Sequence, residues 1–188
     1  MPHNKMKEII QSNIDLSDDI YELFLNSSKR KEVKKNQLLF NQNRATNKIL
    51  FLEKGILRGY KIIDGKDFTH HFYFPNWFAT DFESFLKENP SQIYIETLTD
   101  TIFYEFNKKD LLNLYKKHHQ LEKLGRIIAE KAYLATVEKL SDMQILDLKQ
   151  RFNSLINKNP DLFQKVPQKY IASYLGVSEQ SLSRIKKT

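Results

Sequence analysis

The sequence has 188 residues, of which 40% are hydrophobic and 28% charged, and its formal net charge is +7. A chain of this size can bury an ordinary core as one large domain or as a larger and a smaller one. It has no cysteine, which excludes disulfides, thiolate metal sites, iron–sulfur clusters and cysteine nucleophiles. Because the sequence shows no basic leader with an apolar stretch and no run of about 18 apolar residues, we expect a cytoplasmic protein with no membrane partner.

The positive charge is concentrated toward the C-terminus. Residues 141–188 carry 8 Lys and Arg against 4 Asp and Glu, whereas residues 1–140 carry 22 against 19. A basic terminal segment suits a polyanion such as DNA. Charge that serves only solubility explains the same distribution, so the charge alone leaves both interpretations open.

Short β-rich runs fill residues 37–106. They lie at 37–40, 47–53, 55–63, 68–74, 92–98 and 101–106 and are separated by polar turns. Asp64-Gly65 lies between two of them and is a strong hairpin signal. Six short strands this close together predict an antiparallel sandwich or barrel. Residues 5–25 are predicted to form one or two short helices, with Ser17 as an N-cap.

The pattern changes to a helical period over residues 107–140. Between Ile127 and Val137 apolar residues cover most of the helix circumference, so this helix needs partners on more than one side. Small residues recur on one face, which would let a second backbone approach closely. We expect a dimerisation helix whose interface contains Gly125, Ile128, Ala129, Ala132 and Thr136. The alternative is a helix buried within one subunit.

A further helix is predicted to begin at Ser141, because the S-x-x-Q pattern of residues 141–144 fits a capping box. Its inner face would carry Ile145, Leu148, Phe152 and Leu155. The dipeptide Asn159-Pro160 would end it, since the residue before a proline avoids the helical conformation.

Residues 167–187 have the pattern of two helices joined by a tight turn. Pro167 suits the first position of a helix, because its missing N–H needs no partner there. Gly176 can take the left-handed conformation that ends this helix, and Ser178 can cap the next one. Ala172 is small where two helices crossing at about 90 to 120° would touch. The shared core would contain Ile171, Leu175, Val177, Leu182 and Ile185. This arrangement is typical of a helix-turn-helix.

The outer face of the second helix carries side chains that can read bases. It presents Ser178, Glu179, Gln180, Ser181 and Arg184. In the major groove Gln pairs with adenine, Arg pairs with guanine, and Glu accepts from cytosine. Nearby lysines suit phosphates, which position a helix without specifying sequence. They are Lys165, Lys169, Lys186 and Lys187. For Glu179, an equal alternative is that it only interacts with the helix dipole.

With these elements in order, the sequence resembles the Crp/Fnr family of bacterial transcription regulators. The resemblance is carried by FLEKGILRGY at 51–60, FATDFESF at 78–85 and IASYLGVSEQSLSRI at 171–185. It implies an α+β fold: an antiparallel β-roll (jelly-roll) of the cyclic-nucleotide-binding type, a long dimerisation helix and a small all-α helix-turn-helix domain. The domains would be 1–106, 107–140 and 141–188. The wing that usually follows the family's recognition helix is expected to be lacking.

The resemblance also implies partners and excludes catalysis. Regulators of this family bind near-palindromic double-stranded DNA as homodimers and act with RNA polymerase. We therefore expect these partners here and no enzymatic activity. No cofactor is predicted, and a small-molecule effector of unknown identity would be the expected ligand of the β-roll.

The phosphate-binding cassette departs from the family's cAMP-binding form. Those members have a Gly and a Glu near its start and an Arg toward its end, which neutralises the cyclic phosphate. Here Thr80 and Asp81 replace the Gly and the Glu, and Ser91 or Gln92 replaces the Arg. Residues 91–100 contain no basic residue, so we expect no cAMP binding at ordinary affinity. The candidate pocket comprises Phe78, Thr80, Asp81, Phe82, Glu83, Ser84, Ser91 and Gln92.

Other interpretations of the β-roll remain open. Its aromatic residues Trp77, Phe78, Phe82 and Phe85 could line an apolar effector pocket, or they could be core. The roll could also be a cyclic-nucleotide receptor with unfamiliar cassette residues. A cupin-type enzyme or a haem sensor would need histidine ligands. However, His70-His71 lacks the H-x-H spacing, and neighbours such as His118-His119 diverge by about 100° on a helix. We therefore expect no metal site.

Overall fold

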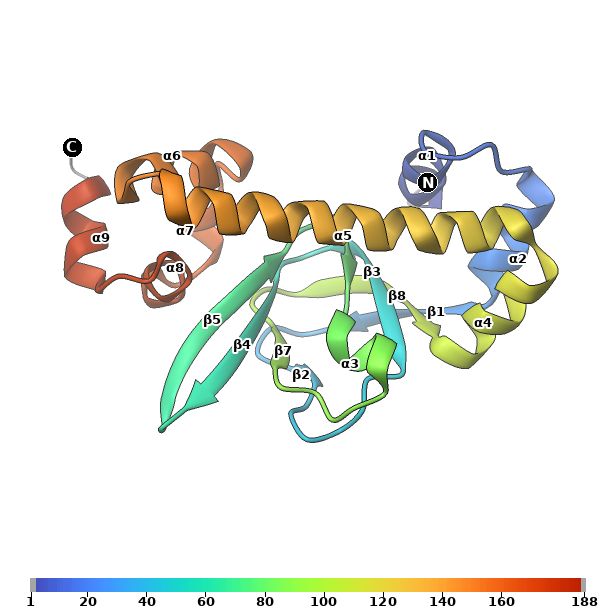
Figure 1. Cartoon of the computed structure of the whole chain (residues 1–188), viewed down its shortest axis with the longest axis horizontal. Coiled ribbons are helices and arrows are strands. Elements are labelled where there is room, and N and C mark those ends of the chain that lie inside the picture. The colour runs from blue at the N-terminus through green and yellow to red at the C-terminus, as the bar shows by residue number, and fades with distance from the viewer. Residues whose placement is uncertain (1–2, 187–188) are drawn as a thin grey trace.

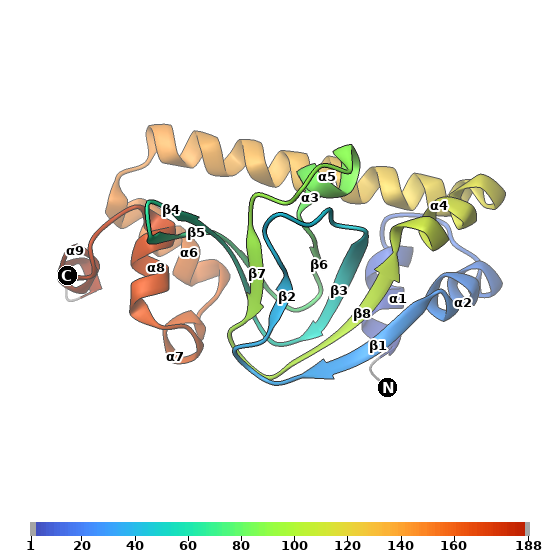
Figure 2. The same cartoon turned by 90° about the horizontal axis from the view of Figure 1, so that it is seen from below.

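The structure, a computed structural model, describes residues 3–186. A β-roll forms its centre, and the long helix α5 (His119–Ile145) runs along one side of the roll (Figure 1, Figure 2). At the N-terminal end of α5 lie α1 (His3–Gln11), α2 (Asp18–Asn26) and α4 (Lys108–Lys117). At its other end lie α6 (Leu148–Lys158), α7 (Leu162–Lys165), α8 (Gln168–Leu175) and α9 (Glu179–Lys186). The fold is α+β, as predicted.

Two four-stranded antiparallel sheets face each other in the roll. The first has the order β1 (Ser28–Val33), β8 (Thr101–Asn107), β3 (Lys48–Lys54), β6 (Phe78–Ala79). The second has the order β2 (Leu38–Phe40), β7 (Tyr94–Thr97), β4 (Leu57–Ile63), β5 (Lys66–Tyr73). Their inner faces bury alternate apolar residues, among them Leu50 and Leu52 of β3 against Leu57 of β4. In β7 more and less buried positions alternate, which gives the period of two, whereas residues 49–52 of β3 are all buried because Ile49 and Phe51 pack against the helices on the other face of the sheet.

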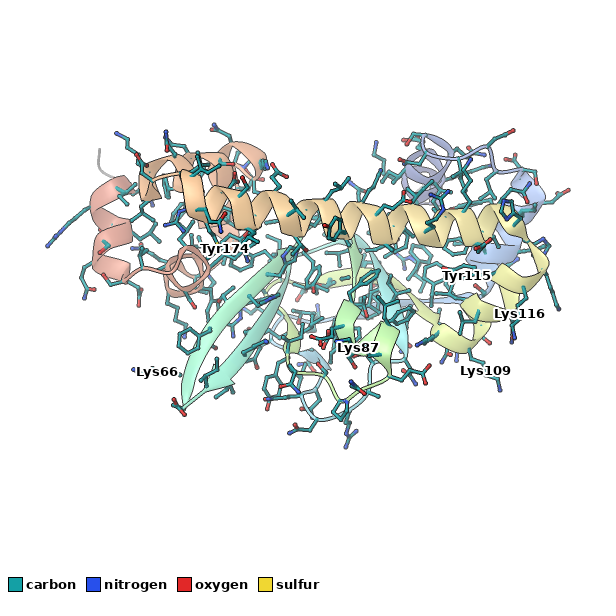
Figure 3. The ribbon with its side chains drawn as sticks, in the orientation of Figure 1. Lys66, Lys87, Lys109, Tyr115, Lys116 and Tyr174 are labelled. Carbon is teal, nitrogen blue, oxygen red and sulfur yellow. The ribbon has the colours of Figure 1, made fainter. Side chains whose placement is uncertain are left out.

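The hairpin β4–β5 forms at the predicted turn. Asp64 and Gly65 have φ angles of 51° and 73°, and Ile63 pairs with Lys66 across them. Positive φ at both central residues is the geometry that makes Asp-Gly favourable in a two-residue hairpin loop. Lys66 marks the tip of this hairpin in Figure 3.

Two strands and two short helices were not predicted. Strand β1 (SKRKEV) is polar and mostly exposed, yet it pairs with β8 along its full length. Cross-strand ion pairs accompany this ladder, such as Lys31 with Glu105 at 2.8 Å. Its sequence lacks apolar alternation because most of its side chains are exposed and make polar contacts. Strand β6, α3 (Phe82–Lys87) and α7 are too short to give a period.

The helical region after the roll differs from prediction at both ends. His118, with φ −134° and ψ 99°, separates α4 from α5, so residues 107–140 are not one helix. The prediction of a new helix at Ser141 was wrong, because α5 continues to Ile145. The capping box lies instead at Asp147, whose carboxylate accepts from Gln150 N at 2.8 Å while the Gln150 side chain accepts from Asp147 N at 2.9 Å. Asp147 is extended and can cap.

Two further predictions need correction. Ile145 is 76% exposed at the end of α5 rather than on the inner face of α6, whereas Leu148, Phe152 and Leu155 are half-buried there. Ser17 occupies the N-cap position of α2 without a side-chain capping bond. Within residues 3–186, no helix combines the length and the apolarity that a membrane span requires.

Candidate DNA-binding interface and effector site

The turn between α8 and α9 has the predicted helix-turn-helix geometry. Gly176 ends α8 with φ 73°, and Val177 N donates to Ala172 O at 3.0 Å. Ser178 Oγ accepts from Ser181 N at 3.2 Å and so caps α9. Pro167 takes the N-cap position rather than the first helical position, so α8 begins at Gln168, one residue later than predicted. The left-handed glycine and the serine cap thus fix the angle between the two helices.

The core of the helix-turn-helix continues into the β-roll. Ile171, Ala172 and Leu182 are at most 2% exposed. They belong to one cluster with Leu162 and Val166 of the preceding segment and with Ile56, Phe72 and Leu98 of the roll. Sequence reasoning found the helix-helix part of this core but not its contact with the roll.

The exposed face of α9 carries the predicted base-reading side chains. Glu179, Gln180 and Arg184 are exposed, and Gln180 and Arg184 are four residues apart on one face. Ser181 is half-buried, and its hydroxyl lies 3.0 Å from that of Ser178. Ser178 and Ser181 therefore serve the helix cap, while Glu179, Gln180 and Arg184 face solvent.

The predicted phosphate-binding lysines surround this face but have local contacts. Lys165 pairs with Asp161 at 2.9 Å, and both side chains are about half exposed. The ammonium groups of Lys169 and Lys186 lie 4.9 and 4.6 Å from the ring centres of Tyr170 and Phe163. Lys187 lies outside the described residues. Exposed contacts of this kind contribute little to stability, so a phosphate could replace them.

A buried arginine joins the helix-turn-helix to the roll. Arg58 on β4 is 1% exposed. Its guanidinium donates two bonds of 2.7 Å to the Asp67 carboxylate and one of 2.9 Å to Glu96. The same group lies between two rings, 4.0 Å from that of Tyr60 and 3.6 Å from that of Tyr170 on α8. Sequence reasoning missed Arg58.

A second contact lies beside this arginine. The Ser173 hydroxyl on α8 accepts from Thr69 N at 2.8 Å, which is a backbone group of β5. Side chains of α8 thus hold the helix-turn-helix on the hairpin β4–β5 of the same chain.

The outer side of α5 is apolar and exposed over its C-terminal half. Tyr133, Leu134 and Leu140 are 68, 62 and 57% exposed, and Val137 lies between them. These four residues, here called the outer face, contradict the alternative of a helix buried within one subunit. The predicted interface residues fall into two groups. In the first, Ala129 and Ala132 are half-buried and Thr136 is exposed.

Gly125 and Ile128 contact their own subunit instead. A Cβ on Gly125 would lie 2.7 Å from the Tyr115 hydroxyl on α4, and Ile128 packs against the cluster between α5 and the first sheet. Tyr115 is labelled at this end of α5 in Figure 3. The glycine therefore permits the close approach of α4, not of a second chain.

The cassette residues are buried and bonded to one another. Asp81 accepts from Ser84 N at 3.2 Å and from the Ser91 hydroxyl at 2.7 Å. The Ser84 hydroxyl lies 2.6 Å from Asn89 O and accepts from Thr46 N at 2.9 Å. Thr80 donates to Lys48 O at 2.9 Å. These four side chains therefore have hydrogen-bond partners within the chain, and none of the partners named here is a cationic side chain.

The other predicted pocket residues pack into the core or lie at the surface. Phe78, Phe82 and Phe85 pack against the cluster beneath α5, as the core interpretation expected. Glu83 pairs with Lys87 at 2.9 Å on the exposed side of α3, and Gln92 is exposed. The ammonium group of Lys108 lies at the end of the cassette and bonds Phe85 O and Glu88.

The four histidines considered as ligands form two adjacent pairs, one on β5 and one at the start of α5. His70 is exposed while His71 is half-buried, and burial lowers the pKa of His71 to about 3, with Lys139 adding to the effect. His119 contacts Glu122 at 3.1 Å. Within residues 3–186, no three His, Cys, Asp or Glu side chains are grouped as a metal site would require.

A cavity of about 150 Å³ lies where the roll, α5 and the C-terminal helices meet. Its walls include Phe74 and Trp77 from the roll, Lys139 from α5, Arg151 from α6 and Tyr174 from α8. Figure 3 shows Tyr174 beneath the C-terminal half of α5. Burial lowers the pKa of Lys139 and raises that of Tyr174. Sequence reasoning did not find this junction cavity, although an arginine among the apolar positions of α6 could have indicated it.

Comparisons with known proteins agree with this architecture. A family model described as the cyclic nucleotide-binding domain matches residues 30–118. No curated protein matches the sequence. The c-di-GMP responsive global regulator CLP of Xanthomonas campestris has 16% identity and a TM-score of 0.68, over 91% of this chain and 90% of that one. FixK2 from Bradyrhizobium japonicum has 15% identity and a TM-score of 0.70, over 85% and 83%.

A third similar structure carries a family assignment of its own. It is a protein from Eubacterium rectale assigned to the Crp/Fnr family of transcriptional regulators, with 19% identity and a TM-score of 0.69 over 92% of this chain and 83% of that one. At these identities the likeness shows the fold. Residues 30–118 thus match the model of the cyclic nucleotide-binding domain, and over most of its length the chain has the fold of these solved structures, one of which is assigned to the Crp/Fnr family.

Proposed function

We propose that the protein is a dimeric, sequence-specific DNA-binding regulator of transcription that acts in the cytoplasm with RNA polymerase as a further partner. The observation that carries the proposal is the capped helix α9, which buries Leu182 and presents Glu179, Gln180 and Arg184 to solvent. A helix held in this way can enter the major groove with its N-terminal residues at the base edges. The C-terminal excess of lysine and arginine supplies the sequence-independent attraction to phosphate.

Selection of bound DNA from a random pool tests this function. Two recognition helices related by a two-fold axis would enter successive major grooves about 34 Å apart, so the selected sites should be near-palindromes with half-sites one helical turn apart. Enrichment of no inverted repeat would contradict the proposal. A single unrepeated half-site would leave DNA reading intact but contradict the dimer.

The outer face of α5 supports the homodimer. Leu140→Glu should shift the protein from dimer to monomer, because a leucine buried on association stabilises by about 1.5 to 3 kcal/mol and the two-fold axis doubles the loss. An increase of at least about 100-fold in the dimer dissociation constant is expected, measured by sedimentation equilibrium. Leu112→Glu on α4 is the matched control, since Leu112 is 45% exposed but lies off this face. An unchanged dimer in Leu140→Glu would contradict the assignment of the interface.

The closed cassette supports a regulator that does not respond to cAMP. A cyclic phosphate placed here would displace the Asp81–Ser91 bond and meet a carboxylate without a cation. Calorimetric titration with cAMP and cGMP at about millimolar concentration should therefore give no binding heat. Saturable heat from either nucleotide would contradict this.

One observation favours a second candidate, a cyclic-nucleotide receptor with unfamiliar cassette residues. The family model for the cyclic nucleotide-binding domain matches residues 30–118 and therefore spans the cassette. The same titration decides between the two: heat that disappears in Asp81→Ala would assign nucleotide binding to this cassette. The buried bonds of Asp81 make the first candidate the better supported one.

A further inference from the structure

The junction cavity differs from the cassette in having unused binding groups. It measures about 150 Å³, a volume that can hold one aromatic ring. We propose that the junction cavity is an effector site and that it takes a small aromatic carboxylate. The proposal concerns a place in the fold other than the cassette, with walls from three parts of the chain.

Aromatic side chains form one side of the cavity. Phe74 and Trp77 meet edge to face, with ring centres 5.5 Å apart at 83°. Tyr174 and Phe72 also line the cavity, with ring centres 5.2 Å apart. The Trp77 side chain is 45% exposed, although tryptophan is large and apolar and its ring packs against Phe74. A ring inserted between Trp77 and Tyr174 would cover surface that is now open to water, which favours an apolar or aromatic body for the ligand.

Two cations supply the polar side. The Arg151 side chain donates through Nη1 to Leu175 O at 3.3 Å, whereas its Nε is buried and has no hydrogen-bond partner among the described residues. A buried donor without a partner is unusual in a folded protein. The Lys139 ammonium donates to His70 O at 2.6 Å and lies 4.4 Å from the ring centre of Tyr174. A carboxylate bound in the cavity would give both cations a counter-ion.

The charges around the cavity favour a single negative charge on the ligand. Lys158 and Glu138, which also line the cavity, pair with each other at 2.8 Å. Asp142 is the other acidic group in the lining, so Lys139 and Arg151 leave an excess of one positive charge. His71 adds none at neutral pH, because burial lowers its pKa to about 3. A monocarboxylate is therefore better matched than a dianion or a cation.

The position of the cavity would link its ligand to DNA binding, a consequence that rests on the proposed function. Its walls belong to the roll, to α5 beside the outer face, and to α6 and α8 of the C-terminal domain. A ligand that contacts all three stabilises the arrangement in which they meet, and it shifts the equilibrium only by its differential affinity for that arrangement. An occupied cavity should hold the helix-turn-helix in the docked position seen here.

Trp77 provides a direct test, because it is the only tryptophan in the chain and its indole N–H gives one resonance in a ¹⁵N–¹H spectrum. Sodium benzoate is the probe and benzyl alcohol its uncharged counterpart, titrated into the full-length protein to about 20 mM, the range suited to a ligand of so few atoms. Benzoate should move the Trp77 resonance saturably, and benzyl alcohol should bind at least about ten-fold more weakly.

Variants assign the effect to the cavity. Arg151→Met should weaken benzoate at least about ten-fold, whereas Arg44→Met, which removes an exposed arginine elsewhere in the roll, should leave it unchanged. If Arg151→Met does not fold, Arg151→Lys serves in its place, since it keeps the charge and loses the guanidinium edge. No saturable shift, equal affinity for benzyl alcohol, or an unchanged affinity in the Arg151 variant would each overturn the proposal.

The readout separates this proposal from the proposed function. The indole resonance requires no DNA, so benzoate binding without any selected DNA site would leave the cavity assignment standing and contradict the regulator. Conversely, DNA selection without benzoate binding would contradict only the cavity.

Discussion

Replacing Gln180 and Arg184 together with alanine should lower affinity for the selected DNA site at least about 100-fold. Each side chain that makes a bidentate base contact supplies about 1 to 3 kcal/mol of discrimination, and a dimer carries two copies of each. Both residues are on the exposed face of α9, so their truncation should leave the fold intact. Fluorescence anisotropy with the selected palindrome and a scrambled duplex measures the change.

Salt dependence distinguishes base reading from phosphate binding. The double variant should lose its preference for the palindrome and keep the salt dependence of the parent protein. Lys165→Ala is the control, because Lys165 lies beside α9 and suits a phosphate. It should weaken both duplexes alike and reduce the salt slope by about 1 for each phosphate that the protein no longer neutralises. A double variant that still prefers the palindrome would show that other residues read the bases.

Arg58→Leu should destabilise the protein by about 3 to 4 kcal/mol. Removing one partner of a buried ion pair costs about 3 to 5 kcal/mol when the remaining charge stays buried. Here the Asp67 side chain is 42% exposed and can be hydrated, although that of Glu96 is only 19% exposed, so the lower part of that range applies. Removal of the guanidinium from the Tyr170 ring adds to the cost.

Arg30→Leu is a close control for that measurement. Arg30 also pairs with two carboxylates of the roll, Glu32 at 2.7 Å and Glu53 at 3.2 Å, but its side chain is 35% exposed. Its loss should cost about 0 to 1 kcal/mol. Urea unfolding of the three proteins gives the free energies, and limited proteolysis reports whether α8 has left the hairpin. Equal losses for Arg58→Leu and Arg30→Leu would refute a special role for the buried arginine.

Local patterns that only one backbone conformation fits could be predicted from the sequence. Asp64-Gly65 and Gly176 were found because few other residues accept their positive φ angles. Strand β1 could not be found, since its side chains are polar and mostly exposed and so give no apolar alternation. The helix boundary failed for another reason: S-x-x-Q at 141–144 and D-x-x-Q at 147–150 fit the same capping pattern, and nothing local decides between them.

Part of the candidate functional site was likewise predictable from local patterns, and part of it was not. Glu179, Gln180 and Arg184 follow from the helical period once the turn is placed, so their exposure was predictable. The Arg58 cluster and the junction cavity depend on residues far apart in the sequence, such as Arg58 with Tyr170. No periodicity encodes such contacts. Only the docking of the C-terminal helices on the roll creates them.

The core shared by α8, α9 and the roll has a consequence for how the chain folds and changes. Ile171 and Leu182 bury their surface in the same cluster as Phe72 and Leu98, so the C-terminal helices and the hairpin should melt together as one cooperative unit rather than as two independent ones. For the same reason, the DNA-reading segment is not an interchangeable module. Grafting a helix-turn-helix from another regulator onto this roll would leave apolar residues of the hairpin uncovered unless they were replaced as well.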